Sequence, residues 1–487
     1  MNRTIFQFFH WYSPEENLWH YAVDQSQRMA DLGITNVWLP PAYKSARGTH
    51  EPGYAVYDLF DLGEFDQRGS VRTKYGTKED YLACINAFHE KSIGILADIV
   101  LNHKVFADEE EDVPVKEVDI NNRNEIISEE HNIRAYTKFT FPGRHGQYSD
   151  FTWDWHSFTG IKVDGKIYVI MNEHTNGTWD DVMEKRYGNY DFLLGCDIEH
   201  RNPAVRDELT YWGKWYVETT GVSGFRLDAV KHMSTDFFPE WLSYLKETLQ
   251  RDFFCVGEYW KADVEPLLHY IEATHNMIQL FDVPLHFNFH QASKSGGDYD
   301  LRQIFDNTLI QQKPEMAITF VDNHDTQPLQ ALESWVEPWF KPHAYALILL
   351  REQGIPSVFF TDFYGAHYED TKGEQTFNID LSVVGELEQL LVTRKTTAYG
   401  EQRDYFDHAN IIGWTRAGIQ DMPNSGCAVL ISNRDGGEKN MHIGTEHVGK
   451  KMINIFGDHA FEITVNENGE TTFFVDAGKI AVWIFKQ

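Results

Sequence analysis

Short, nearly continuous runs of apolar residues recur along most of the chain. Parallel strands covered on both faces of a sheet have this pattern, whereas half-exposed strands alternate apolar and polar residues. The eight candidate strands are residues 5–9, 36–39, 94–101, 224–227, 254–258, 278–281, 317–321 and 357–360. Helical periodicity occurs between them, for example over residues 81–91, 203–219 and 237–251. Eight alternating strand and helix units predict an α/β fold, the (β/α)8 or TIM barrel.

Two parts of the chain depart from this alternation. The segment between the third and fourth candidate strands is too long for an unstructured loop in a compact domain, so we predict an inserted subdomain over residues 104–199. After Thr396 the pattern changes to short alternating strands, such as residues 411–415, 427–432 and 480–485, separated by Gly- and Asn-rich turns. We therefore predict a barrel domain over residues 1–103 and 200–395, and an antiparallel β-sandwich domain over residues 396–487.

Composition narrows the class of protein. A chain of 487 residues exceeds the ~250–300 residues at which single cores stop growing. With 42% hydrophobic and 24% charged residues, it is an ordinary globular protein. The 43 Lys and Arg against 74 Asp and Glu give a net charge of −31, which argues against a nucleic-acid partner. The 14% aromatic content is mostly explained by large core side chains, with a minority available to stack on sugar rings.

The cysteines and the first residues bear on location. Cys84, Cys196, Cys255 and Cys427 lie far apart without a C-x-x-C motif, so we expect free, buried thiols. The N-terminal residues lack the apolar core and cleavage site of a signal peptide. Aliphatic runs are far shorter than the ~20 residues that a membrane span requires. We expect a cytoplasmic, monomeric protein without a membrane partner.

Polar residues stand at the carboxyl ends of four candidate strands. They are Asp98, Asn102 and His103 in the third segment, Arg226, Asp228, Lys231 and His232 in the fourth, Glu258 and Trp260 in the fifth, and His324 and Asp325 in the seventh. A single strand-end carboxylate is commonly a loop cap or an ion-pair partner. Three that converge, Asp228, Glu258 and Asp325, are costly in a dry pocket unless they serve a function. The alternative is a buried structural ion-pair network.

These segments resemble, in order, the four signature regions of the α-amylase family of glycoside hydrolases. The matching segments are residues 98–103, 224–232, 257–260 and 320–325, and residues 193–200 resemble the family's further motif on the calcium side. The resemblance covers nearly the whole chain, including the barrel, the insertion and the C-terminal sheet domain. It is greatest to the bacterial liquefying α-amylases and their cytoplasmic relatives.

The resemblance implies that Asp228 is the nucleophile, Glu258 the general acid and base, and Asp325 a third carboxylate that holds substrate hydroxyls. The roles of Asp228 and Glu258 agree with the chemistry of the reaction, because glycoside cleavage needs one ionised carboxylate and one protonated acid. Arg226 lies two residues from Asp228 on the same side of the strand and can keep it ionised. Burial near other carboxylates should raise the pKa of Glu258 and keep it protonated.

The resemblance also implies substrate contacts around the catalytic carboxylates. His103 and His324 match histidines that hydrogen-bond the sugar beside the nucleophile, and Tyr54 matches a tyrosine that stacks on it. Lys231 and His232 match residues of the leaving-group subsite. Trp260 has the apolar body and polar edge that sugar faces favour. The alternative for each aromatic residue or histidine is an ordinary place in the core.

A Ca²⁺ site is implied as well. Asn102, Asp191 and Asp197 match side-chain ligands, and His232 matches a residue that contributes its backbone carbonyl. Oxygen ligands suit Ca²⁺ rather than Zn²⁺. Such an ion would join the inserted subdomain to the barrel. Arg201 stands where some relatives have another aspartate, which puts a second metal cluster in doubt, and Asp180 is either a ligand or a surface turn residue.

The leading interpretation is a retaining endo-hydrolase of α-1,4-glucosidic bonds in starch, glycogen or maltodextrins. One alternative is a 4-α-glucanotransferase that uses the same site, in which a sugar hydroxyl replaces water as acceptor. Another alternative is a glycan-binding or transporter-associated protein on an inactive barrel, which would typically lack one of the three carboxylates.

Overall fold

The computed structural model describes residues 2–14, 17–457 and 461–486. Within these residues, eight parallel strands form a closed barrel in the order β1-β16-β15-β14-β13-β12-β5-β2. The barrel strands are β1 (Ile5–Gln7), β2 (Asn36–Leu39), β5 (Gly94–Ile99), β12 (Gly224–Leu227), β13 (Phe254–Gly257), β14 (Gln279–Phe281), β15 (Ala317–Phe320) and β16 (Ile355–Phe359). The predicted (β/α)8 barrel is confirmed, and each apolar run overlaps one of its strands.

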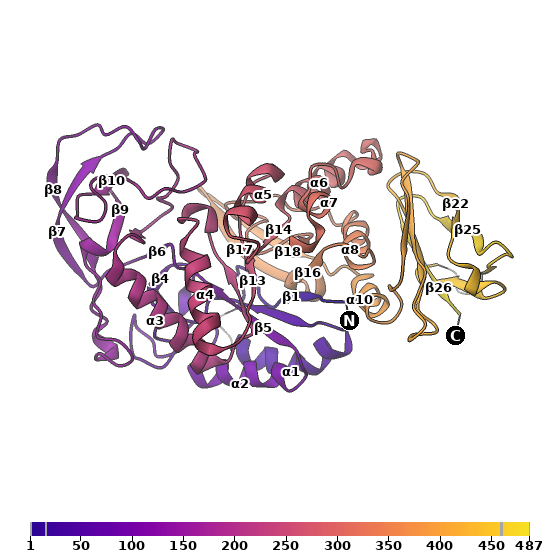
Figure 1. Cartoon of the computed structure of the whole chain (residues 1–487), viewed down its shortest axis with the longest axis horizontal. Coiled ribbons are helices and arrows are strands. Elements are labelled where there is room, and N and C mark those ends of the chain that lie inside the picture. The colour runs from indigo at the N-terminus through magenta and orange to yellow at the C-terminus, as the bar shows by residue number, and fades with distance from the viewer. Residues whose placement is uncertain (1, 15–16, 458–460, 487) are drawn as a thin grey trace.

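Helices surround the barrel in the centre of the molecule (Figure 1). They are α1 (Leu18–Asp31), α2 (Lys78–His89), α3 (Pro203–Thr220), α4 (Phe237–Leu249), α5 (Val264–Ala273), α6 (Val283–Ser295), α7 (Leu309–Gln312), α8 (Lys341–Leu349), α9 (Phe360–Tyr364) and α10 (Leu387–Thr396). Local sequence fixes their ends. α2 begins at a capping box between Thr77 and Asp80. α3 begins at Asn202 and Pro203 and stops at Gly221, whose φ of 71° favours glycine.

The register of β12 determines which side chains meet inside the barrel. Arg226 pairs with Asp98 on β5 and with Val256 on β13. At the start of β12, a Cβ on Gly224 would lie 1.9 Å from the carbonyl oxygen of Phe254, so the close approach of β13 requires glycine there. This register places Asp98 and Arg226 side by side in the core.

The long segment after β5 contains a six-stranded sheet in the order β6-β11-β9-β10-β7-β8, at the left of Figure 1. Its strands are β6 (His103–Lys104), β7 (Glu109–Glu117), β8 (His131–Lys138), β9 (Phe158–Val163), β10 (Lys166–Ile170) and β11 (Cys196–Ile198). Antiparallel pairing places Asp197 of β11 opposite His103 of β6. The end of the inserted segment therefore returns to the point where it leaves the barrel.

Antiparallel sheets form the C-terminal part of the chain, at the right of Figure 1. One sheet has the order β19-β20-β21-β26-β23-β24, and a second consists of β22 and β25. The strands are β19 (Gln402–Tyr405), β20 (Ile411–Arg416), β21 (Cys427–Ser432), β22 (Gly437–His442), β23 (Lys451–Asn454), β24 (Glu462–Thr464), β25 (Glu470–Val475) and β26 (Ile480–Phe485). Buried side chains of both sheets, such as Leu430 and Phe473, share one apolar cluster. The predicted antiparallel C-terminal region is confirmed, whereas the exact domain boundaries stay predictions.

Two hairpins were not expected from the sequence. β3 (Lys44–Ser45) pairs with β4 (Val56–Asp58), and β17 (Ala366–Lys372) pairs with β18 (Gln375–Leu381). The second hairpin has many exposed positions and so lacks the apolar signal of a barrel strand. Its Tyr368 stacks on Tyr12 with ring centroids 3.9 Å apart, which fastens the hairpin to the segment after β1.

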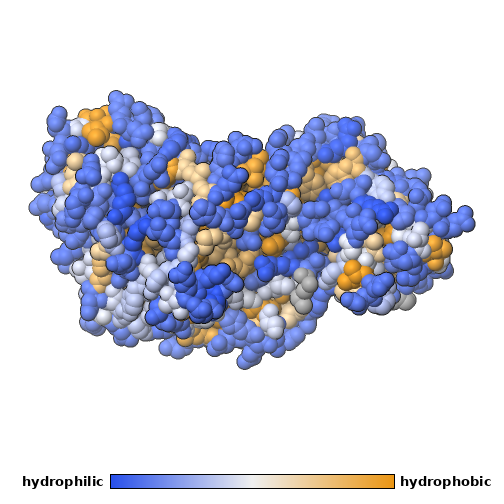
Figure 2. All heavy atoms as spheres, viewed as in Figure 1, coloured by the Kyte–Doolittle hydropathy of each residue, from blue (hydrophilic) through white to orange (hydrophobic). Residues whose placement is uncertain are grey.

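Most of the face seen in Figure 2 is hydrophilic, with apolar residues in small groups. This agrees with a net charge of −31. Among the described residues, helices long and apolar enough to cross a membrane are absent. The four cysteines are free and buried, as expected.

Candidate active site

One arginine links the carboxylates at the carboxyl ends of two adjacent barrel strands. Arg226 Nη1 lies 2.5 Å from Asp228 Oδ1, directly after β12, and Nη2 lies 3.2 Å from Glu258 Oε2, directly after β13. The backbone N–H of Ala229 also donates to Glu258 Oε2, at 3.2 Å. Asp325, in the loop after β15, lies close enough for Glu258 and Asp228 to affect its ionisation. The three predicted catalytic carboxylates therefore share one site.

Asp98 has a supporting role that sequence reasoning did not assign. Its Oδ1 accepts a hydrogen bond from Arg226 Nη1 at 3.0 Å. Its Oδ2 accepts from the Tyr54 hydroxyl at 2.7 Å and from Trp38 Nε1 at 3.0 Å. With both oxygens occupied and the side chain fully buried, Asp98 positions Arg226 and Tyr54. Its place in the same motif as Asn102 and His103 was the available signal.

The electrostatics distinguish the two central carboxylates. Burial raises the pKa of Asp228 to about 6, while Arg226 opposes the rise. Burial also raises the pKa of Glu258, again opposed by Arg226 and reinforced by the negative charge of Asp228. Because Arg226 is nearer to Asp228 than to Glu258, it favours the ionised form of Asp228 more strongly. Burial and the Glu258 charge raise the pKa of Asp325 well above its ordinary value.

Two predicted sugar-contacting histidines border this site as neutral side chains. Burial and Arg226 lower the pKa of His324 well below its ordinary value, and burial lowers the pKa of His103 to about 4. His324 Nδ1 bonds to Gln7 Nε2 at 3.0 Å, which leaves Nε2 without a hydrogen-bond partner among the described residues. His103 Nε2 bonds to the carbonyl of Tyr54 at 3.0 Å. His324 Nε2 instead lies 3.4 Å from Asp325 Oδ2, beside the third carboxylate.

Stacked rings form one wall of the site. The Tyr54 ring lies 5.0 Å from the His324 ring at an interplanar angle of 12°, and 5.7 Å from the Trp11 ring at 8°. Tyr54 and Trp11 are half-buried, so each keeps some exposed surface. Trp11 was not predicted, although its position just after the first strand would have marked it as a residue of the carboxyl-end loops.

The remaining predicted binding residues gather beside Glu258. Lys231 Nζ donates to the Trp260 carbonyl at 3.0 Å, and both side chains are half-buried. His232 Nδ1 bonds to the carbonyl of Tyr190 in the inserted segment, at 2.7 Å. The structure therefore brings Lys231, His232 and Trp260 together on one side of the carboxylates.

The predicted calcium ligands also lie close to one another. Asn102 Nδ2 donates to Asp197 Oδ1 at 3.4 Å, and the N–H of Asp180 donates to Asp191 Oδ2 at 2.9 Å. All four side chains are buried. Asn102 Oδ1, Asp180 Oδ2 and Asp197 Oδ2 have no hydrogen-bond partner among the described residues. Orphaned oxygens of this kind fit a hard cation, and the buried position of Asp180 contradicts its reading as a surface turn residue.

Repulsion among the buried carboxylates Asp180, Asp191 and Asp197 also favours a bound cation. Burial and Asp180 raise the pKa of Asp191 to about 8, and burial and Asp191 raise the pKa of Asp197 well above its ordinary value. Within the described residues, His, Cys, Asp and Glu side chains alone do not form a metal-binding group of three or more. A Ca²⁺ ion would therefore need the Asn102 amide and backbone carbonyls as further ligands. Arg201 forms an ion pair with Glu199 at 2.7 Å, so a cation stands here rather than a further carboxylate.

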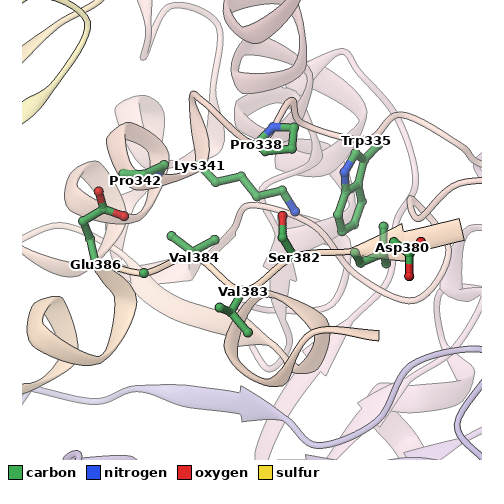
Figure 3. A pocket seen from close by; sticks show the side chains of 11 residues that line it. Trp335, Pro338, Lys341, Pro342, Asp380, Ser382, Val383, Val384 and Glu386 are labelled. Carbon is green, nitrogen blue, oxygen red and sulfur yellow. The ribbon is translucent and has the colours of Figure 1, made fainter. Parts of the chain in front are cut away.

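A separate cavity of about 110 Å³ has none of Asp228, Glu258 and Asp325 in its lining (Figure 3). Trp335 and Lys341 line it together with residues 380–386, which include the end of β18 and the segment after it. Lys341 Nζ lies 2.9 Å from Asp322 and 2.5 Å from Asp362, so its charge is already compensated within the protein. We assign the active site to the carboxylates rather than to this cavity.

Two carboxylates held at adjacent strand ends of a TIM barrel are typical of a glycoside hydrolase, and the chain is one. Residues 23–382 match the model of the alpha amylase catalytic domain. The chain belongs to the alpha-amylase family.

Full-length relatives agree with this membership. The chain is 46% identical to the cytoplasmic alpha-amylase of Escherichia coli K12 over 494 residues, covering 100% of this chain and 99% of the relative. It is also 46% identical to an alpha-amylase of Geobacillus stearothermophilus, covering 99% of this chain and 87% of the relative. The crystal structure of an alpha-amylase from Geobacillus thermoleovorans in complex with acarbose is similar, with a TM-score of 0.64 at 18% identity over 100% of this chain and 98% of that one. This structural similarity supports the barrel fold with its C-terminal sheet region.

Proposed function

We propose that the protein hydrolyses internal α-1,4-glucosidic bonds of starch, glycogen or maltodextrins with retention of anomeric configuration. The observation that carries the proposal is the Arg226 guanidinium between Asp228 and Glu258, which lies nearer to Asp228 and so favours its ionised form more strongly, while burial and the Asp228 charge raise the pKa of Glu258. The relatives named alpha-amylase support the substrate class. Because all three family carboxylates are present, an inactive binding protein is disfavoured.

The reaction proceeds in two steps. In the first, a carboxylate oxygen of Asp228 attacks the anomeric carbon while the bond to the leaving oxygen breaks. Glu258 gives its proton to that oxygen, which departs as a free hydroxyl group. In the second step, Glu258 removes a proton from water, and the resulting oxygen displaces Asp228 from the glycosyl ester. Asp228 and Glu258 thereby return to their starting states.

The remaining site residues bind and orient the sugar. Tyr54 offers a ring face, and the free Nε2 of neutral His324 is placed to meet a hydroxyl beside Asp325. His103 holds the backbone of Tyr54. Lys231, His232 and Trp260 border the side of Glu258, where the leaving group would lie. These residues bind the sugar or, in the case of His103, position a residue that binds it, and none of them transfers a proton.

Calcium enters the proposal as a structural ion. Asn102, Asp191 and Asp197, with Asp180 and the backbone carbonyl of His232, would hold it. When bound, Ca²⁺ supplies a fixed positive charge that offsets the adjacent carboxylates. The inserted segment and the barrel would both be bound to the ion, which would keep Lys231 and His232 beside Glu258.

We further propose that the protein acts in the cytoplasm and as a monomer. The relative named cytoplasmic alpha-amylase supports the proposed location.

Product analysis tests the proposed reaction. Chromatography of products from amylose and maltohexaose should show a mixture of shorter chains early in the reaction, as internal cleavage requires. Proton NMR should show that the first products carry the α-anomer. Initial β-anomer would refute retention, and early release of one product size only would refute internal cleavage. Longer chains formed from maltotriose would favour the 4-α-glucanotransferase alternative.

A further inference from the structure

A cavity of about 590 Å³ lies at the end of the barrel opposite the carboxylates. Thr4 and Thr35, which line it, directly precede β1 and β2, so the cavity is at the amino ends of these strands. α10 contributes Arg394 and Lys395, and Met422 comes from the loop between β20 and β21. Figure 1 shows the N-terminal end of the chain beside α10, between the barrel and the C-terminal sheets. The cavity thus joins parts of the chain that are distant in sequence.

Arg394 is a buried cation without an anionic partner. It donates from Nε to Thr4 Oγ1 at 2.9 Å, from Nη1 to the Leu349 carbonyl at 2.5 Å, and from Nη2 to the Arg3 carbonyl at 2.8 Å. These acceptors are neutral, and no carboxylate of the described chain lies within 4.0 Å of it. Burial and the nearby Arg416 lower the pKa of Arg394 to about 9. A guanidinium has five N–H donors, so two remain for another acceptor.

Two other buried cations of the same protein, Lys341 and Arg226, are compensated by carboxylates. Lys341, in the cavity of Figure 3, is held between Asp322 and Asp362. Arg226 contacts Asp98, Asp228 and Glu258. An uncompensated buried charge is costly, and a bound anion would remove this cost at Arg394.

The cavity around Arg394 is also positively charged overall. Lys91, Arg394 and Lys395 line it, against one carboxylate, Asp421, which gives a net formal charge of 3 − 1 = +2. This sign is opposite to that of the whole chain, whose net charge is −31. A phosphate monoester carries about −1.5 to −2 at pH 7 and accepts hydrogen bonds from guanidinium groups in a bidentate manner.

We propose that this cavity binds a small organic phosphate, with the phosphate group against Arg394 and between Lys91 and Lys395. Apolar lining residues such as Ile34, Leu391 and Met422 would contact the organic part. The cavity volume lies within the ~300–1,000 Å³ of small-molecule sites, so it accommodates a body of the size of a monosaccharide. A ligand there would bridge α10, the start of the barrel and the C-terminal loop, and so stabilise their packing.

The experiment uses the full-length enzyme and three probes: glucose 6-phosphate, inorganic phosphate and glucose. Isothermal titration should show one saturable site for glucose 6-phosphate and none for glucose, and the phosphate ester should raise the melting temperature. Equal affinity for inorganic phosphate would assign the ligand as free phosphate, whereas weaker binding would show that the organic part contributes. Failure of both phosphates to bind would overturn the proposal.

Matched variants locate the bound phosphate. Lys91→Ser with Lys395→Ser should weaken phosphate binding about tenfold, whereas Lys246→Ser with Lys294→Ser, at exposed lysines elsewhere, should leave it unchanged. Arg394→Lys should weaken it further, and retained hydrolysis of maltohexaose would show that this variant is folded. Equal binding by both double variants would overturn the proposal. Competitive inhibition of hydrolysis would also overturn it, because that result places the phosphate at the carboxylates.

Discussion

Arg226 Nη1 lies 2.5 Å from Asp228 Oδ1, two residues further along the chain. The same nitrogen also donates to Asp98. The other terminal nitrogen donates to Glu258. One buried cation thus holds in position the carboxylates on which the proposed reaction depends, and it opposes the rise in their pKa that burial causes. This arrangement needs the planar fork of arginine, because a lysine ammonium is a single point charge.

The substitution Arg226→Lys should therefore keep the positive charge but lose the simultaneous hydrogen bonds to Asp228 and Glu258. We expect kcat/KM on maltohexaose to fall by at least ~100-fold, because the nucleophile is no longer held in place. The acid limb of the kcat/KM profile should move to higher pH, since a more distant cation stabilises ionised Asp228 less. Arg206→Lys is the control, because Arg206 forms partly exposed ion pairs away from the site. Unchanged activity of Arg226→Lys would contradict the proposed role.

The pH dependence of kcat/KM follows from the two central pKa values. Asp228 must be ionised, so activity should rise through pH of about 6 as its carboxyl group loses a proton. Glu258 must be protonated, so activity should fall as pH rises through its elevated pKa. Lys231 lowers the pKa of Glu258. Lys231→Met should therefore shift the alkaline limb to higher pH, while Lys261→Met should leave it in place. A shift to lower pH would contradict the assignment of Glu258 as the acid.

The barrel strands and the site carboxylates could be predicted from the sequence, for a physical reason. Barrel strands covered on both faces are mostly apolar, so all eight were detectable in the sequence, and residues 36–39 and 224–227 coincide with their strands. Asp228 and Glu258 were recognisable because each directly follows such a strand, and Asp325 because it lies in the loop after another. The hairpin of β17 and β18 was missed because its exposed side chains need no apolar pattern.

Other features depend on contacts that no local pattern specifies. Trp11 stacks on Tyr54, although the two residues belong to different loops. Gln7 interrupts an apolar run, and only the closed barrel places it against His324. Asp180 resembles a turn residue in sequence, yet the fold buries it beside Asp191. Tertiary packing determines these contacts, so they can be identified only from the three-dimensional structure.

Calcium removal should destabilise the inserted segment first. An ion that binds the folded state alone contributes binding free energy to folding, so thorough chelation should lower the melting temperature by at least about 5 °C. Hydrogen exchange should increase over residues 104–199 before it increases in the barrel. Asp197→Asn should reproduce the loss and no longer respond to added Ca²⁺. Asp181→Asn is the matched control, because Asp181 is exposed and pairs with Lys185. Equal melting with and without Ca²⁺ would refute the site.

The two catalytic carboxylates should differ when the leaving group is changed. Asp228→Asn removes the nucleophile, so turnover should be lost on starch and on an activated α-glucosyl fluoride alike. Glu258→Gln removes the proton donor, which a sugar leaving group needs but fluoride does not. This variant should therefore lose starch cleavage yet still react with the fluoride. Without a base to activate water, the glycosyl ester should accumulate, and mass spectrometry of the quenched protein should place it on Asp228. A label on Asp325, or equal loss of both substrates in Glu258→Gln, would show that these roles are wrong while leaving the barrel and the calcium site unaffected.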